Sequence, residues 1–262
     1  MKKMLMIVKL CLIGMLSTYA TAANWDNGAL GSDSWTDAAN WQGDVLPAGA
    51  NTWMDNSDTA VINVGDTGNV GMFFPQGSGG GTADLTIQGT LNTTGRIRIA
   101  DAINSNGIIT IDGGTLNVPD HMYVGSAYLA GNISASGTLV VKNGGVVNQT
   151  ANGYGLKVPA HYADSNTSGL IELFDGIIHT VDLYIGATGL VKVGAGSIII
   201  EGNEFTEMNN YKNAGLLVPM NPLDTIDVSY DGDFTTITSV PEPATMALLG
   251  LGGLFIKKRK KC

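Results

Sequence analysis

Residues 107–117 read GIITIDGGTLN, and the same order of residue types returns further along the chain. The copies are GTLVVKNGGVVN at 137–148, GLIELFDGIIH at 169–179 and GLVKVGAGSII at 189–199, with a weaker copy, DLTIQGTLN, at 84–92. The four full copies begin with a glycine, and every copy joins two short apolar stretches through a glycine-containing corner. Repetition of one such unit is the sequence signature of a repeat architecture.

The unit predicts short β-strands, because apolar residues alternate within it with a period of two. In several units a third stretch of this kind follows, at 96–100, 122–125 and 183–186. Three short strands per unit predict an all-β fold, a single-stranded right-handed parallel β-helix in which each unit is one rung. Insertions at 126–136 and 151–168 are then loops at one corner. A β-sandwich, which also has many short strands, is the alternative.

The repeats also predict which side chains form the core. The second and fourth residues after each repeat glycine hold the same alternating position, so they should point inward and stack from rung to rung. These residues are Ile109, Ile111, Leu139, Val141, Ile171 and Leu173.

The segment before the repeats, residues 24–76, contains all four tryptophans: Trp25, Trp35, Trp41 and Trp53. Its order of residues resembles the opening module of secreted, repeat-rich β-helical proteins. A β-helix has an open first rung whose edges would pair with another chain, so we expect this segment to be a cap with the indoles in its core. The alternative role of the tryptophans is a platform on which sugar rings stack.

The remaining boundaries follow from composition. We expect the repeats to fill residues 82–203, joined to the cap by a flexible glycine-rich segment at 77–81. Residues 204–239 predict a short helix over 204–214 and then a hairpin that turns at Asp231-Gly232. Helix and hairpin together would cover the other open end of the β-helix.

Residues 1–23 have the organisation of a secretory signal peptide. Basic residues come first, a short apolar stretch follows, and small residues around Ala22 and Ala23 form the cleavage site. The two cysteines, Cys11 and Cys262, lie outside the predicted body, which therefore depends on no disulfide.

The last segment, residues 240–262, contains three ordered elements. Pro241, Glu242 and Pro243 are followed by the uncharged stretch 244–256. Because proline fixes φ and lacks an N–H, we expect Pro241 and Pro243 to keep the Pro-Glu-Pro stretch out of the hairpin before it and the helix after it. The basic cluster that ends the chain is Lys257, Lys258, Arg259, Lys260 and Lys261. As a helix the uncharged stretch spans about 20 Å, less than a hydrocarbon core of about 30 Å, so its basic flank should reach the cytoplasmic interface.

This ending resembles the tail of PEP-CTERM proteins. The resemblance implies that Pro241, Glu242 and Pro243 form a sorting motif, recognised and cut by an exosortase, a membrane-embedded cysteine protease. It also implies an exported protein that is anchored in the inner membrane by a short transmembrane helix until the tail is cut. Its location is then the cell envelope or the extracellular space.

Charge limits the partners of the body. Without the signal and the tail, 22 acidic residues face six basic ones, and these six are Arg96, Arg98, Lys142, Lys157, Lys192 and Lys212. So acidic a body repels nucleic acid and anionic lipid. Its acids keep it soluble, and calcium at the aspartates Asp224, Asp227, Asp231 and Asp233 is a secondary hypothesis without the spacing of an EF-hand.

No arrangement of residues predicts catalysis strongly. His121, His161 and His179 fall in different units without a shared spacing, and the sequence lacks a nucleophile elbow, a phosphate-binding loop and a zinc-protease motif. Arg96 and Arg98 alternate onto one strand face, where they could meet Asp84 or Asp112 of adjoining rungs.

We therefore expect a structural or adhesive envelope protein, not an enzyme, with no cofactor and with extracellular polysaccharide as its partner. A carbohydrate-binding protein, or a polysaccharide lyase or hydrolase with its carboxylates in a groove, is the alternative.

Overall fold

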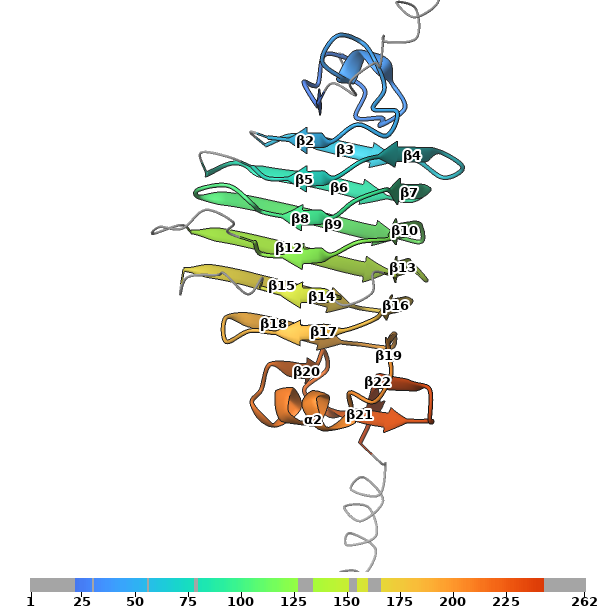
Figure 1. Cartoon of the computed structure of the whole chain (residues 1–262), viewed down its shortest axis with the longest axis vertical. Helices are drawn as coiled ribbons and strands as arrows, with labels where there is room; N and C mark the ends of the chain where they lie inside the picture. The colour runs from blue at the N-terminus through green and yellow to red at the C-terminus, as the bar shows by residue number, and fades with distance from the viewer. Residues whose placement is uncertain are drawn as a thin grey trace, which may run out of the picture.

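The computed structural model describes residues 22–29, 31–55, 57–77, 80–126, 134–150, 155–159 and 166–242. The chain winds into a stack of rungs, with a cap at each end (Figure 1). Successive strands enter three sheets in turn, so each rung contributes one strand to each sheet. We call them sheet 1, sheet 2 and sheet 3, in the order in which a rung enters them.

The three sheets contain seven, eight and seven strands. In spatial order, sheet 1 consists of β20 (Leu217–Pro219), β18 (Gly189–Val193), β15 (Thr167–Leu173), β12 (Ala135–Lys142), β9 (Ser105–Asp112), β6 (Thr82–Ile87) and β3 (Thr59–Ile62). Sheet 2 consists of β21 (Asp224–Tyr230), β22 (Phe234–Pro241), β19 (Ser197–Glu201), β16 (Ile177–Thr180), β13 (Val146–Gln149), β10 (Thr115–Val118), β7 (Thr90–Thr93) and β4 (Thr67–Val70). Sheet 3 consists of β1 (Ala23–Asn24), β2 (Thr52–Met54), β5 (Phe73–Pro75), β8 (Ile97–Ile99), β11 (Met122–Val124), β14 (Leu156–Val158) and β17 (Leu183–Ile185).

The pairing confirms the predicted parallel β-helix. Within the stack, neighbouring strands of all three sheets run parallel, for example β9 with β12 and β12 with β15. The predicted repeat register is also confirmed, since Gly137 lies opposite both Gly107 and Gly169, and Gly169 lies opposite Gly189. The antiparallel sheets of the alternative β-sandwich are not present in the described stack. The right-handed sense of the winding stays a prediction.

The repeat glycine is required by a close contact with another strand. A Cβ atom added at Gly137 would lie 2.1 Å from the backbone nitrogen of Gly125, and one at Gly169 would lie 2.2 Å from the carbonyl oxygen of Val124. At Gly189 the distance to the carbonyl oxygen of Val158 would be 1.9 Å. Only a residue without a side chain fits at these positions, where the end of a sheet 3 strand passes close to a later strand of sheet 1.

The core lies between the sheets, where inward side chains stack from rung to rung. Leu139 lies opposite Ile109 and Ile171, and Val141 lies opposite Ile111 and Leu173. All six residues predicted as core are fully buried, as expected from their alternating positions.

The stack begins earlier than the sequence predicted. Strands β2 to β5, within the range assigned to the cap, each pair in parallel with the strand of the next rung in the same sheet. Two glycines of the predicted joint also contact the stack, because Gly77 bridges Asn106 and the Gly80 N–H donates to the carbonyl of Asn104. Burial and hydrogen bonding therefore extend across the predicted boundary at residue 82.

The N-terminal cap covers the first strand edges. The N–H of Val61 in β3 donates to the carbonyl of Asp33, and the N–H of Trp35 donates to the carbonyl of Val61, both at 2.8 Å. At β4 the N–H of Gly49 donates to the carbonyl of Asn69 at 3.1 Å. The cap also holds one turn of 3-10 helix, η1 (Ala38–Asn40), which begins after Asp37, whose side chain accepts the N–H of Ala39. Backbone groups that would pair with another chain are thus occupied.

The C-terminal cap is a helix and a hairpin, as predicted. Helix α2 (Phe205–Asn213) buries Met208, and β22 pairs antiparallel with both β19 and β21. The Nζ of Lys212 in α2 donates to the carbonyl of Ile226 in β21 at 2.5 Å, so a charged group lies at the outermost edge of sheet 2.

One expectation for this end was wrong. The two prolines were expected to keep the Pro-Glu-Pro stretch out of the hairpin, yet Pro241 is the last residue of β22 and lies opposite Asp224. A proline is compatible with the end of a strand, because it lacks only the N–H donor.

Candidate functional site

Two columns of polar side chains run along the outer face of sheet 2. The first, the threonine column, consists of Thr67, Thr90 and Thr115, which lie opposite one another in β4, β7 and β10. The second is formed by the asparagines two residues further along each strand, and β13 continues it. The register of the β-helix therefore brings hydroxyls and amides from distant parts of the sequence to one surface, one rung, or about 4.8 Å, apart.

The asparagines form an amide ladder: Asn69, Asn92, Asn117 and Asn148. The Nδ2 of Asn92 donates to the Oδ1 of Asn69 at 3.1 Å, Asn117 donates to Asn92 at 2.8 Å, and Asn148 donates to Asn117 at 2.9 Å. Each amide has two N–H donors and an oxygen with two lone pairs, so a member inside the ladder keeps one donor and one acceptor for a ligand.

This outer face carries no formal charge over β4, β7, β10, β13 and β16, where no outward position holds Asp, Glu, Lys or Arg. We call it the uncharged face. Sheet 1 differs, because outward ion pairs join its strands, Lys142 with Asp112 at 3.4 Å and Lys192 with Glu172 at 3.0 Å. On so acidic a body, the uncharged face is a surface where a neutral ligand meets little unpaired charge.

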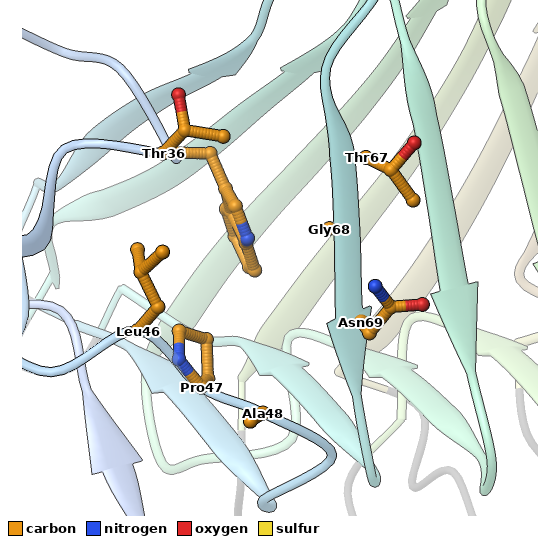
Figure 2. Close-up of a pocket in the computed structure, with 8 residues that line it drawn as sticks. Thr36, Leu46, Pro47, Ala48, Thr67, Gly68 and Asn69 are labelled. Carbon is orange, nitrogen blue, oxygen red and sulfur yellow. The ribbon is translucent and has the colours of Figure 1, made fainter.

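A pocket lies at the N-terminal end of the uncharged face, where the cap meets β4 (Figure 2). Its volume is about 170 Å³, and its lining consists of Trp35, Thr36, Leu46, Pro47, Ala48, Thr67, Gly68 and Asn69. The first members of the threonine column and of the amide ladder lie on one side, and Leu46 and Pro47 face them from the cap loop. The pocket thus combines an apolar wall with hydroxyl and amide groups, the usual composition of a small-ligand site.

The tryptophans fit the capping role better than the sugar platform. Trp25, Trp35 and Trp41 are 4%, 2% and 0% exposed, and they pack edge to face or stacked with centroids 4.6 to 6.3 Å apart. The Nε1 of Trp41 donates to the carbonyl of Trp35 at 2.9 Å. Buried rings have no free face for a sugar, so the stacking hypothesis does not fit Trp25 or Trp41. Trp35 reaches the pocket lining, and Trp53 stacks on Phe74 of sheet 3 at 5.1 Å.

In the described part of the chain, Arg98 and Asp112 form ion pairs with other residues, not with each other. Arg98 pairs with Asp101, three residues further along, at 2.9 Å, and Asp101 also accepts the hydroxyl of Ser126 at 2.8 Å. Asp112 pairs with Lys142 of the next rung instead of with Arg98. The first pair is local and the second joins neighbouring strands of sheet 1, so neither brings two carboxylates and a base together.

The histidines remain separate. His121 pairs with Asp120 beside it, and His179 lies opposite Asn148 in sheet 2. His161 lies outside the described residues. Among the described residues, no group of three or more His, Cys, Asp or Glu side chains could hold a metal ion.

The aspartates predicted for calcium are engaged in turns. Asp231 accepts the N–H groups of Asp233 and Phe234 at 2.9 and 2.8 Å, and these backbone hydrogen bonds lower its pKa. Asp224 accepts the side-chain amide of Asn221 at 2.9 Å at the other end of the hairpin. The two ends are separated by the length of β21, so these carboxylates do not converge.

The predicted sorting tail lies at the end of the chain, mostly outside the described residues. Pro241 completes β22 and Glu242 is exposed, whereas Pro243, the stretch 244–256 and the basic cluster 257–261 lie outside the described residues. A family of known sequences, described as the PEP-CTERM protein-sorting motif, matches residues 239–261. The chain carries a PEP-CTERM sorting motif. The motif marks an exported protein that is anchored transiently in the membrane and processed by an exosortase.

The remaining comparisons add no relative of the chain that carries this motif. Neither the comparison with curated proteins nor that with solved structures finds a match. Within the described residues, no helix has the length and apolar character needed to span a bilayer. The predicted membrane helix at 244–256 and most of the predicted signal peptide lie outside that part of the chain.

The uncharged face could not be found from the search for catalytic motifs. Its signal in the sequence is the triplet Thr-x-Asn, which occurs at 67–69, 90–92 and 115–117. The pocket has no comparable signal, because its two walls come from separate segments, 46–48 and 67–69.

Proposed function

We propose that the protein is an exported, non-catalytic surface protein that binds a neutral extracellular polysaccharide through the uncharged face. Sugar hydroxyls both donate and accept hydrogen bonds, and so do the groups of the threonine column and the amide ladder. A single exposed hydrogen bond adds only about 0.5–1.5 kcal/mol, so binding would depend on several rungs that act together on one chain. The single observation that carries the proposal is the uncharged face itself, maintained over successive rungs of an acidic body.

The pocket supports the same proposal. Leu46, Pro47 and Ala48 offer apolar atoms to the C–H face of a sugar ring, while Thr67 and Asn69 offer polar atoms to its hydroxyls. Leu46 is 42% exposed, so part of its side chain is accessible to a ligand in the pocket. A glycan that lies along the uncharged face would reach this pocket at one end.

The sorting motif supports this proposal. An exported body can meet extracellular polysaccharide, and cutting of the tail would release the body from the membrane. Binding to polysaccharide would then retain the protein at the cell envelope by contacts of its own. Such a role is structural or adhesive.

A pair of double variants tests the proposal. Thr90→Ala with Thr115→Ala removes two neighbouring hydroxyls of the threonine column and leaves the amide ladder intact. The matched control is Thr86→Ala with Thr110→Ala, which removes two outward hydroxyls that lie opposite each other in sheet 1. The processed protein is run in gels that contain a neutral glucan or an acidic uronate polymer.

We expect the neutral glucan to slow the migration of the wild-type protein. The sheet 2 variant should lose at least fivefold in affinity for this glucan, and the affinity of the control variant should not change. Equal binding by both variants, or a preference for the uronate polymer, would contradict the proposal. Shortening of the neutral glucan during incubation would instead favour a hydrolase, and shortening of the uronate polymer would favour a lyase or hydrolase.

A further inference from the structure

The sorting motif overlaps the folded C-terminal cap. The match begins at residue 239, whereas β22 continues to Pro241. Ser239, Val240 and Pro241 lie opposite Ile226, Thr225 and Asp224 of β21. The first residues of the motif are therefore part of an antiparallel hairpin in the folded protein.

The end of this hairpin is weakly anchored. Val240 is 39% exposed, and Pro241 and Thr225 are also exposed. The Oγ of Ser239 reaches the Oδ2 of Asp224 only at 3.5 Å. Pro241 cannot donate a backbone hydrogen bond, so the pairing must stop there.

The hairpin is much better anchored a short way from its end. Ile226 is 3% exposed and Ile237 is fully buried, and β22 is also paired with β19 from Phe234 to Thr238. Segments with few buried contacts open at low free energy while the rest of a protein stays folded. Opening of the hairpin should therefore stop at Ile226 and leave the rungs intact.

An extended peptide that enters a binding cleft commonly gives its backbone N–H and C=O groups to the partner, as an added strand does. In the closed hairpin, β21 occupies one edge of residues 239–241. We propose that the β21–β22 hairpin gates the processing of the sorting motif, so that the exosortase gains the first residues of the motif only when the end of the hairpin opens.

A reversible cross-link tests the gate. Residues directly opposite in an antiparallel pair have Cα atoms about 4.5–5.5 Å apart, a distance that a disulfide spans. Thr225→Cys with Val240→Cys would lock the end of the hairpin. Ser229→Cys with Thr236→Cys, opposite each other nearer the turn, is the matched control. Both variants carry Cys262→Ser, so that no other cysteine remains in the chain once the signal peptide is removed.

Processing is followed by pulse-labelling and immunoblotting of cells that cut the wild-type tail, with and without dithiothreitol. We expect the lock at 225 and 240 to slow cutting at least tenfold, with recovery to within twofold of wild type after reduction. The control cross-link should leave the rate unchanged. Cutting at the wild-type rate while the disulfide at 225 and 240 is closed would overturn the gate. The gate is also overturned if dithiothreitol does not restore the rate of cutting, or if the control disulfide slows cutting to the same extent.

A weakening variant gives an independent measurement. Thr225→Pro lies outside the motif and removes a backbone donor from β21 at the end of the hairpin. We expect cutting to become severalfold faster while the thermal unfolding of the processed body changes little. Slower or unchanged cutting would contradict the gate.

Discussion

At the scale of single residues, buried charge makes stability depend on pH. One carboxylate oxygen of Asp84 is buried and finds no hydrogen-bond partner in the described part of the chain. Burial raises the pKa of Asp84 above its ordinary value of 3.8, and Lys142 offsets part of this rise. Because the folded state disfavours the ionised form, Asp84 costs stability as the pH rises from about 3.8 through its raised folded pKa.

Asp84→Asn should therefore raise the melting temperature at pH 7 and lose this advantage as the pH falls below 3.8. Thermal unfolding across pH 3–7 measures the difference. Asp231→Asn is the control of opposite sign, because backbone hydrogen bonds lower the pKa of Asp231 and favour its charged form. A stabilising effect of Asp84→Asn that is the same at every pH would contradict this account.

Asn117 is the residue that tests whether the amide ladder stabilises the stack. Its side chain donates to Asn92 and accepts from Asn148, whereas Asn69, at the end of the ladder, takes part in only one ladder hydrogen bond. Asn117→Ala should cost about 1–2 kcal/mol and Asn69→Ala about half as much, since each hydrogen bond contributes about 0.5–1.5 kcal/mol. Equal losses in urea unfolding would show that the bonds do not act along the ladder.

At the scale of elements, the packing of one strand depends on its register with its neighbours. Leu139 is fully buried in β12 between Ile109 and Ile171. Leu139→Ala should cost about 2–5 kcal/mol, because it leaves a cavity that the paired strands cannot close. The outward neighbour Thr138→Ala is the control and should change stability by less than about 0.5 kcal/mol. A near-neutral Leu139→Ala would mean that the stacked register is wrong.

The repeated strands could be predicted from sequence, while the earliest ones could not. Copies that begin at Gly107, Gly137, Gly169 and Gly189 share the glycine and the alternating apolar positions, so they can be aligned by eye. In β6 the residue opposite Gly107 is Ala83, and no repeat glycine marks the rung before it. The first rungs therefore looked like part of the cap.

The contact that explains the repeat glycine could not be predicted from the sequence either. Spacing shows that a glycine is needed, but the atom that would collide with a side chain belongs to the end of a sheet 3 strand, as Val124 does for Gly169. The same applies to the pocket and to the overlap of the sorting motif with β22. Each joins segments whose proximity is set by the winding of the chain.

At the scale of the whole molecule, the body and the tail should be separable in function. Replacing Pro241, Glu242 and Pro243 by alanine should leave export intact but trap the full-length protein in the membrane, because the exosortase loses its motif. Deleting residues 244–262 should instead release the body into the medium without retention. Immunoblots of membrane and medium fractions measure both outcomes. Normal shortening and release of the alanine variant would contradict the sorting role.

Because the register is preserved from rung to rung, the height of the stack is set by the number of rungs between the N-terminal cap and the strands that precede the sorting tail. The N-terminal cap lies at the opposite end of the stack from β21 and β22, the last strands before the sorting tail in the sequence (Figure 1). While the tail is in the membrane, the number of rungs therefore sets how far the pocket can reach into the layer around the cell. Duplicating one short rung, residues 169–188, should lengthen the body by about 4.8 Å and leave both caps unchanged. Small-angle scattering of the processed protein would measure this added height. The same increase is the extra distance from the membrane at which the pocket of the anchored protein could bind a ligand.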